Sequence, residues 1–156
     1  MMRTFCWPLL LLLGCALHRG AEGWMCPGGF HKHGRSCYWF SNIKGNFAEA
    51  RSICHALDSE LATITSYAEN AFIRGYATQR GKAERYYLGG TDLGLEGHWK
   101  WMGNKPFIYT NWAPGEPSNS LNNEHCLEVL RKLGYHWNDE KCDTSGNFIC
   151  ETVPLK

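Results

Sequence analysis

The sequence predicts an α+β domain in which two helices precede a series of short strands joined by long loops. Residues 46–57 and 66–77 each carry apolar side chains at helical spacing behind a residue that can cap a helix. After Gly81 the apolar residues fall in short pieces separated by glycine, asparagine and proline, which is typical of short strands. Six cysteines lie beyond residue 23, an even number that predicts three disulfide bonds in an exported domain.

Residues 1–23 have the features of a secretory signal peptide. Arg3 precedes an apolar run from Phe5 to Leu17, which is too short to span a membrane. Ala21-Glu22-Gly23 then places small residues where a signal peptidase cleaves, so we expect cleavage before Trp24 and a secreted, extracellular product. The alternative is an uncleaved N-terminal anchor, which is disfavoured because no second apolar segment follows.

Residues 24–156 suit one domain with its core at about residues 26–151. Two arginines and one glutamate leave with the predicted signal, so 14 basic and 14 acidic side chains remain. This balance provides neither the basic stripe that binds nucleic acid nor an acidic tract, and we expect no nucleic-acid partner. Zinc is the alternative use of the cysteines, but the sequence contains no Cys-x-x-Cys pair.

Capping residues and periodicity define the elements of the first half. Residues 26–37, rich in glycine and turn residues, predict a short hairpin with a cysteine at each end. Asn46 can cap a first helix, and Ser66-Tyr67-Ala68-Glu69 is a capping box that begins a second. The side chains expected to face the core are Phe47, Ala50, Cys54 and Leu57 in the first helix and Phe72, Ile73, Tyr76 and Ala77 in the second.

The second half is expected to form the strands. Their predicted positions are Tyr86–Leu88, Trp99–Trp101, Cys126–Leu130 and Phe148–Cys150. Tryptophans in this half of the chain are predicted to belong mainly to the core rather than to a binding surface.

Oxygen-bearing side chains crowd around two cysteines between residues 116 and 142. The segment contains Glu116-Pro117-Ser118, Glu124 just before Cys126, and Trp137-Asn138-Asp139 just before Cys142. Three carboxylates in so short a span would repel one another unless a cation neutralised them. Ca²⁺ prefers ligand sets made only of oxygen, so the pattern predicts a calcium site.

These residues resemble the long form of the C-type lectin domain. The resemblance covers nearly the whole chain from Cys26 to Glu151 and rests on five features: the Cys26/Cys37 pair, Tyr87-Leu88-Gly89-Gly90, Trp112, Glu116-Pro117-Ser118 and Trp137-Asn138-Asp139. A narrower set is similar to the perlucin-like lectins of calcified shell matrix. It comprises Cys37-Tyr38-Trp39-Phe40, residues 72–78, Tyr109-Thr110-Asn111-Trp112 and residues 124–128.

The resemblance implies a C-type lectin-like fold with long calcium-binding loops and the pairings Cys26–Cys37, Cys54–Cys150 and Cys126–Cys142. It also implies a principal calcium site that doubles as the sugar-binding site, with a cis bond between Glu116 and Pro117. The implied ligands are Glu116, Ser118, Glu124, Asn138 and Asp139, together with the backbone carbonyl of Asp139. Six cysteines alone would leave 15 connectivities open.

Ser118 departs from the family pattern. Members that bind mannose carry Glu-Pro-Asn at this place and those that bind galactose carry Gln-Pro-Asp, whereas this chain has Glu-Pro-Ser. Glu116 favours mannose, N-acetylglucosamine or related sugars. Serine is shorter than asparagine by an amide group, so we expect weaker affinity and leave galactose as an alternative.

An auxiliary calcium site of the family corresponds to Asp92, Glu96 and Asn119, with Glu124 shared between the two sites. Asn119 and His125 stand where acidic residues would add charge, and ligand charge helps to set calcium affinity. We expect this auxiliary site to be weak or empty.

The resulting hypothesis is a Ca²⁺-dependent lectin without catalysis, because no nucleophile-elbow or metal-hydrolase spacing occurs in the sequence. The perlucin-like resemblance implies a shell-matrix protein that binds glycans or matrix glycoproteins and promotes nucleation or growth of calcium carbonate crystals. One alternative is a soluble immune lectin that recognises microbial glycans. Another is a structural matrix protein that does not bind sugar.

Overall fold

The computed structural model describes residues 24–155, and the predicted signal peptide over residues 1–23 lies outside this part. Its helices are α1, Phe47–Ala56, and α2, Tyr67–Tyr76, the latter followed by a π-helical turn at Ala77–Gly81. The strands are β1 His31–His33, β2 Ser36–Phe40, β3 Glu60–Leu61, β4 Arg85–Thr91, β5 Lys100–Trp101, β6 Cys126–Leu130, β7 His136–Glu140 and β8 Asn147–Thr152. Within residues 24–155, none of the helices has the length and apolar character that a membrane crossing requires.

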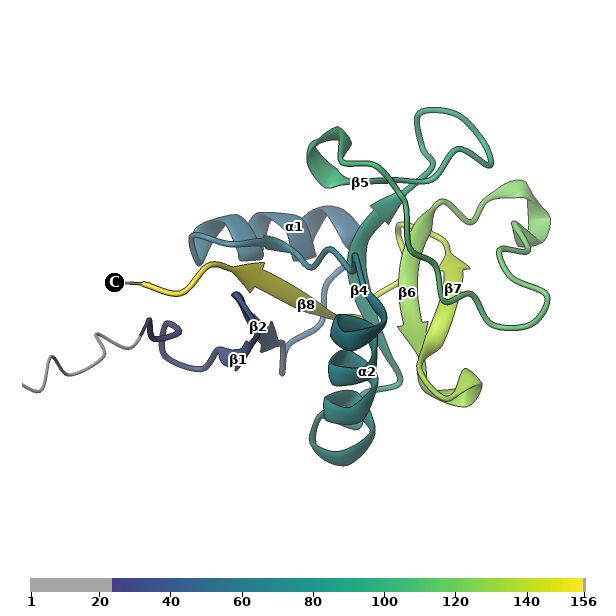
Figure 1. The fold of residues 1–156 in the computed structure, drawn as a ribbon. Coiled ribbons are helices and arrows are strands. Elements are labelled where there is room, and N and C mark those ends of the chain that lie inside the picture. Colours follow the sequence, from purple (N-terminus) through teal and green to yellow (C-terminus); the bar gives the residue numbers. More distant parts are fainter. Residues whose placement is uncertain (1–23, 156) are drawn as a thin grey trace, which may run out of the picture.

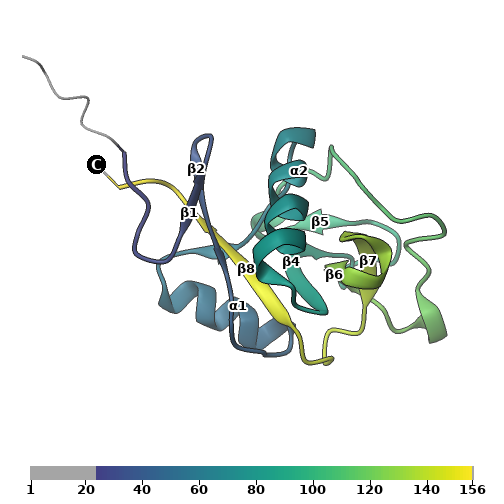
Figure 2. The same cartoon turned by 90° about the horizontal axis from the view of Figure 1, so that it is seen from below.

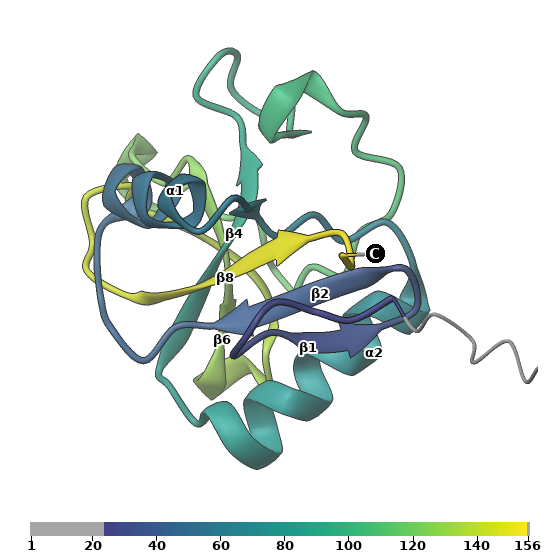
Figure 3. The ribbon, with the colours of Figure 1, turned by 90° about the vertical axis from the view of Figure 1, so that its left-hand side faces the viewer.

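The strands form one mixed sheet in the order β1-β2-β8-β4-β6-β7. β3 pairs with β8 and β5 pairs with β4, and every pairing is antiparallel except that of β4 with β8. The two helices lie on opposite sides of β8, as the three views agree (Figures 1, 2 and 3). The predicted α+β class, with two helices and short, mostly antiparallel strands, is confirmed.

Local sequence explains where the helices begin and which sides are buried. Asn46 caps α1, as predicted, and it also forms a full capping box with Glu49. In α2, Ser66 Oγ accepts from the backbone N–H of Glu69, but the Glu69 carboxylate turns to Thr65, so only half of the predicted box forms. The predicted inward face of α1 is wrong at one position, since Leu57 follows the last turn and is 40% exposed.

The four residues predicted to face inward in α2 are buried to different degrees. Ile73 and Ala77 are fully buried, whereas Phe72 and Tyr76 are only partly buried and pack against the edge of the core. One buried side chain of this helix was not predicted: Asn70, whose Oδ1 accepts from the indole N–H of Trp137 at 2.9 Å.

Two packed clusters form the core on either side of β4 and β8. One centres on Trp101, Trp137 and Tyr38, and the other surrounds the disulfide between Cys54 and Cys150. Burial of Trp101 and Trp137 confirms the prediction that these tryptophans are structural. The other disulfides are Cys26–Cys37 and Cys126–Cys142, so all three implied pairings are present.

The four predicted strands are found, β6 with the predicted bounds and β4, β5 and β8 with shifted ones, and β7 was missed as a strand. The chain between β4 and β6, residues 92–125, runs mostly as loop and projects from the sheet at the end of the molecule away from the C-terminus (Figure 1). This placement brings the long loop beside β7, which carries Asn138 and Asp139.

Candidate functional site

Asp139 is the buried anchor of the predicted calcium site. It is 1% exposed on β7, and its carboxylate faces the long loop. Oδ1 accepts the backbone N–H of Ser118 at 2.9 Å, and Oδ2 accepts that of Asn119 at 2.6 Å. One side chain thus fixes the segment that follows Pro117, whose bond to Glu116 is cis, as the resemblance implied.

Glu124 closes the same loop from its other end. Its Oε2 accepts the backbone N–H of Ser120 at 2.8 Å and the hydroxyl of Ser118 at 3.3 Å. Its own N–H donates to Asn119 Oδ1 at 3.0 Å. The resemblance implied Asn119 as a ligand beside Asp92 and Glu96, and these hydrogen bonds hold Asn119 in the loop between Glu124 and Asp139.

Glu116 has an unpaired buried oxygen. Its Oε2 is shielded from solvent and has no hydrogen-bond partner among the described residues. Burial raises the pKa of Glu116 above its usual value, and the nearby carboxylates of Asp139 and Glu124 raise it further. The carboxylates of Asp139 and Glu124 therefore lie close enough to disfavour the charged form of Glu116.

Asn138 is oriented from below by a buried glutamate. Its Nδ2 donates to Glu128 Oε1 at 3.0 Å and to the Asp139 carbonyl at 2.7 Å. Both amide hydrogens are then in use, and Oδ1 is the polar atom of this side chain left for a ligand. All five predicted residues are thus brought to one region, and the donor chemistry, oxygen atoms only, suits a hard dication such as Ca²⁺.

A buried charge network under this region was not predicted. Glu128 is fully buried on β6, and its Oε2 lies 3.2 Å from Arg85 Nη1. Arg85 also pairs with Glu140 on β7. Burial raises the pKa of Glu128 to about 8, although Arg85 opposes the rise, and the same arginine lowers the pKa of Glu140 despite partial burial. The alternating pattern of β6 and β7 could have indicated that these charges share one face.

A histidine joins two residues of the predicted auxiliary set. Asp92 and Glu96 lie close together and form a group of three potential ligands with His125. His125 Nδ1 lies 3.1 Å from Asp92 Oδ1 and 3.3 Å from Glu96 Oε2. The position of His125 just before β6, next to the end of β4, was the available signal, since β4 and β6 were both predicted strands.

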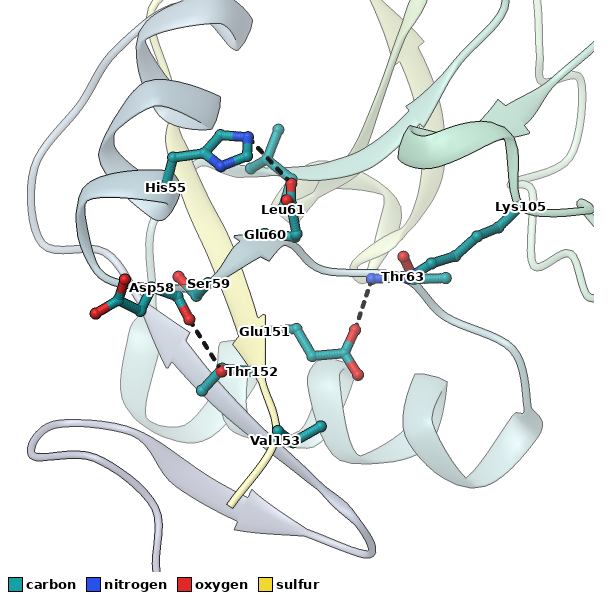
Figure 4. A pocket seen from close by; sticks show the side chains of 10 residues that line it. All are labelled: His55, Asp58, Ser59, Glu60, Leu61, Thr63, Lys105, Glu151, Thr152 and Val153. Atoms are coloured by element: carbon teal, nitrogen blue, oxygen red, sulfur yellow. Dashed lines mark hydrogen bonds and ion pairs between the residues drawn. The ribbon is translucent and has the colours of Figure 1, made fainter. Parts of the chain in front are cut away.

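An open cavity of about 380 Å³ lies elsewhere, between β3, the end of α1 and the start of the C-terminal segment (Figure 4). Glu151 lines it and accepts the backbone N–H of Thr63 at 2.9 Å, and His55 faces Glu60 at 3.3 Å. None of the residues that line this cavity belongs to either carboxylate set. The cavity and the predicted calcium site are therefore separate features.

Comparison with known proteins confirms the predicted C-type lectin-like fold. Residues 43–152 match the family model described as "Lectin C-type domain". The chain is 54% identical to "Perlucin" of Haliotis laevigata over 127 residues, which cover 81% of this chain and 82% of that protein. It is 34% identical to the "Perlucin-like protein" of Mytilus galloprovincialis over 128 residues, covering 80% and 81% of the two chains. Among solved structures, the mouse scavenger receptor C-type lectin carbohydrate-recognition domain superposes with a TM-score of 0.77 at 34% identity, covering 84% of this chain and 98% of that one.

Proposed function

Because this chain belongs to the C-type lectin family, we propose that it is a secreted, calcium-dependent carbohydrate-binding protein that performs no catalysis. The principal calcium and sugar site is assigned to Glu116, Ser118, Glu124, Asn138 and Asp139. The observation that carries this proposal is the convergence of three carboxylates around the unpaired buried oxygen of Glu116. Such a set is stabilised when a dication compensates its charge.

Each side chain has a defined part in this proposal. Asp139 holds the loop in place through two backbone N–H groups, and Glu128 turns the amide of Asn138 so that its oxygen faces outward. Glu116 and Glu124 accept hydrogen bonds from sugar hydroxyls. A bound Ca²⁺ supplies coordination positions for two neighbouring hydroxyls of the sugar.

The proposed preference is for mannose, N-acetylglucosamine or related sugars. Glu116 supports it because the mannose-type pattern begins with glutamate. Both amide hydrogens of Asn138 are engaged inside the protein, and the exposed Ser118 hydroxyl donates to Glu124. Donation to a sugar oxygen therefore requires the Ser118 hydroxyl to turn from Glu124 toward the sugar. Galactose is the alternative ligand, and a glycan array probed with and without Ca²⁺ decides between them.

The test of the proposed function is retention on immobilised mannose. The wild type should bind in Ca²⁺ and elute with a chelator, whereas Glu116→Gln should pass through. Calorimetry on the oxidised protein should show Ca²⁺ uptake at millimolar concentrations, and a failure to detect it would reject this mechanism.

The proposed biological role is in an organic shell matrix, where the protein binds matrix glycans and promotes nucleation or growth of calcium carbonate crystals. Its support is the identity to the perlucin of Haliotis laevigata and the perlucin-like protein of Mytilus galloprovincialis. Expression in shell-forming epithelium would favour this role, and expression in blood cells would favour a soluble immune lectin. Adsorption to carbonate crystals that competing sugar does not alter would favour a structural matrix protein without sugar binding.

A further inference from the structure

A second group of potential metal ligands lies outside the calcium set proposed above, and it contains a nitrogen donor. Asp92, Glu96 and His125 each offer one ligand atom, and these atoms all lie within 4.8 Å of one another. The group shares no side chain with the principal calcium site. His125 directly follows Glu124 in the chain, so the two sites are neighbours that use different side chains.

The backbone holds Asp92 and His125 in position before any ligand arrives. The carbonyl of His125 accepts the hydroxyl of Thr91 at 2.7 Å and the N–H of Asp92 at 3.3 Å, and the N–H of His125 donates to the Glu140 carbonyl at 3.2 Å. Asp92 Oδ2 accepts the N–H of Gly97 at 2.8 Å, which leaves Oδ1 directed at the imidazole. Hydrogen bonds of this kind to a ligating carboxylate are typical of the outer shell of metal sites.

The three side chains differ in solvent exposure, as expected for a metal site that is open to solvent on one side. The Asp92 side chain is 1% exposed, that of His125 25% and that of Glu96 54%. Asp92 and His125 thus form a fixed base, and Glu96 stands at the entrance, where its side chain can move toward an ion. Solvent on this side can provide a further ligand.

The donor atoms favour a transition metal over calcium. Ca²⁺ selects oxygen ligands, whereas imidazole combined with carboxylates suits Zn²⁺ and its neighbours. Around tetrahedral Zn²⁺, bonds of about 2.0–2.2 Å place neighbouring ligand atoms about 3.4 Å apart. His125 Nδ1 already lies 3.1 Å and 3.3 Å from the two carboxylate oxygens, so an ion could enter with only a modest movement of Glu96.

We propose that Asp92, Glu96 and His125 form a binding site for a transition-metal dication of the Zn²⁺ type, at the place where the auxiliary calcium site was expected. The imidazole binds the ion through Nδ1, and its remaining nitrogen carries the ring hydrogen. The competing arrangement is a hydrogen-bonded group of the same three side chains that holds no metal.

Calorimetric titration of the full secreted chain with Zn²⁺ in an excess of Ca²⁺ tests the proposal. We expect one equivalent of Zn²⁺ to bind, and Co²⁺ at the same site to show the intense visible absorption of near-tetrahedral coordination. Loss of an outer-shell partner costs about 10–100-fold in metal affinity, so His125→Asn and Asp92→Asn, which remove direct ligands, should each weaken binding at least about tenfold.

The matched control is His55→Asn, which removes a histidine that faces a single carboxylate at 3.3 Å on another part of the surface. It should bind Zn²⁺ as tightly as the wild type. Absence of Zn²⁺ uptake by the wild type, or unchanged affinity in His125→Asn, would overturn the proposal. Retained Ca²⁺-dependent mannose binding by His125→Asn shows that the variant is folded and that the sugar site stands apart from this result.

Discussion

Ser118 shows how one side chain can limit a binding site that its neighbours otherwise complete. Its backbone N–H is held by Asp139, but its short hydroxyl lies 3.1 Å from Ser120 Oγ and 3.3 Å from Glu124 Oε2. The hydroxyl is therefore occupied within the loop, and it lacks the amide that asparagine would offer to both an ion and a sugar.

Ser118→Asn should tighten mannose binding in the presence of Ca²⁺ by roughly tenfold, equivalent to about 1.4 kcal/mol, because the longer amide adds a ligand oxygen and a donor. Competition for a mannose column measures the change. Ser52→Asn is the control, since it adds the same amide to an exposed serine outside the loop and should leave affinity unchanged. Equal or weaker binding by Ser118→Asn would contradict this explanation of the motif.

Glu116 is expected to reduce stability when no cation is present. Its unpaired buried oxygen and the adjoining carboxylates of Asp139 and Glu124 are compensated only by a proton or a cation. Glu116→Gln should therefore equal or exceed the wild type in stability in chelator. Of these two proteins, only the wild type should gain strongly in stability from Ca²⁺, by about 2.7 kcal/mol at a hundredfold excess over Kd.

Thermal denaturation with chelator and with Ca²⁺ measures both effects. Glu84→Gln, which neutralises an exposed carboxylate on the turn before β4, serves as the control and should retain the gain from Ca²⁺. A wild-type melting temperature that Ca²⁺ does not change would show that these carboxylates form no calcium site.

At the scale of elements, strands β4, β6 and β7 place a buried charge network below the proposed site. Arg85 on β4 lies between Glu128 on β6 and Glu140 on β7. Removal of one partner from such a pair usually costs about 3–5 kcal/mol, because the other charge stays buried.

Arg85→Gln should lower the free energy of unfolding by about 2 kcal/mol, below that range because the raised pKa of Glu128 lets it take up a proton. The double variant Arg85→Gln/Glu128→Gln should recover much of the loss, since no unpaired buried charge remains there. Urea denaturation of the four proteins in this cycle provides the coupling energy. Strictly additive losses would show that the two side chains do not interact.

Glu151, on β8 where this strand pairs with β2 and β3, predicts that the stability of the protein depends on pH. Burial raises the pKa of Glu151, although hydrogen bonds from the Ser36 hydroxyl and the Thr63 N–H oppose the rise. The folded protein thus keeps this proton to higher pH than the unfolded chain does. The contribution of Glu151 is present in full below the unfolded pKa of about 4.3 and is lost as pH rises through the raised folded value.

Glu151→Gln should remove this dependence, and its amide can still accept from Thr63 and donate to Ser36. We expect the variant to gain stability relative to the wild type as pH rises from about 4 toward about 7, as measured by urea denaturation at each pH. Glu84→Gln is again the exposed control. A difference between wild type and Glu151→Gln that stays constant with pH would contradict the assignment.

Most elements could be predicted from the sequence because their signals are local. The prediction failed where pairing between distant segments determines whether a segment forms a strand. Asn46 and the periodicity of α1 suffice to place that helix. In contrast, β7 contains Asn138 and Asp139, which are poor strand formers, and only its full register with β6 makes it a strand. The family resemblance implied the five proposed calcium ligands because they lie within recognisable motifs. The direct contact of His125 with Asp92 was not predicted, because it depends on how β4 and β6 end beside each other.

At the scale of the whole molecule, the proposed sugar site lies on an open loop surface and not in the cavity of Figure 4. A single shallow site of this kind usually binds with a Kd of about 1 mM, or about −4 kcal/mol. Two copies joined by a linker that spans neighbouring glycans can gain about 10²–10⁴ in avidity.

A dimer made by a coiled coil fused after residue 156 should therefore bind a mannose-coated surface at least about 10²-fold more tightly than the single chain. Surface plasmon resonance measures the difference. The same dimer with Glu116→Gln in one copy should return to single-chain affinity, and if it does not, the gain comes from contacts other than the proposed sites.

The backbone bridge between Met25 and Leu155 has a practical consequence for such assemblies. It ties the two ends of the described chain together on the side of the molecule opposite the long loop between β4 and β6 (Figure 1). A bead, a fluorophore or a mineral-coated particle grafted at either end would leave the sugar-facing surface pointing outward. The chain can therefore be attached to a surface through either terminus while the proposed sugar-binding loops face solvent.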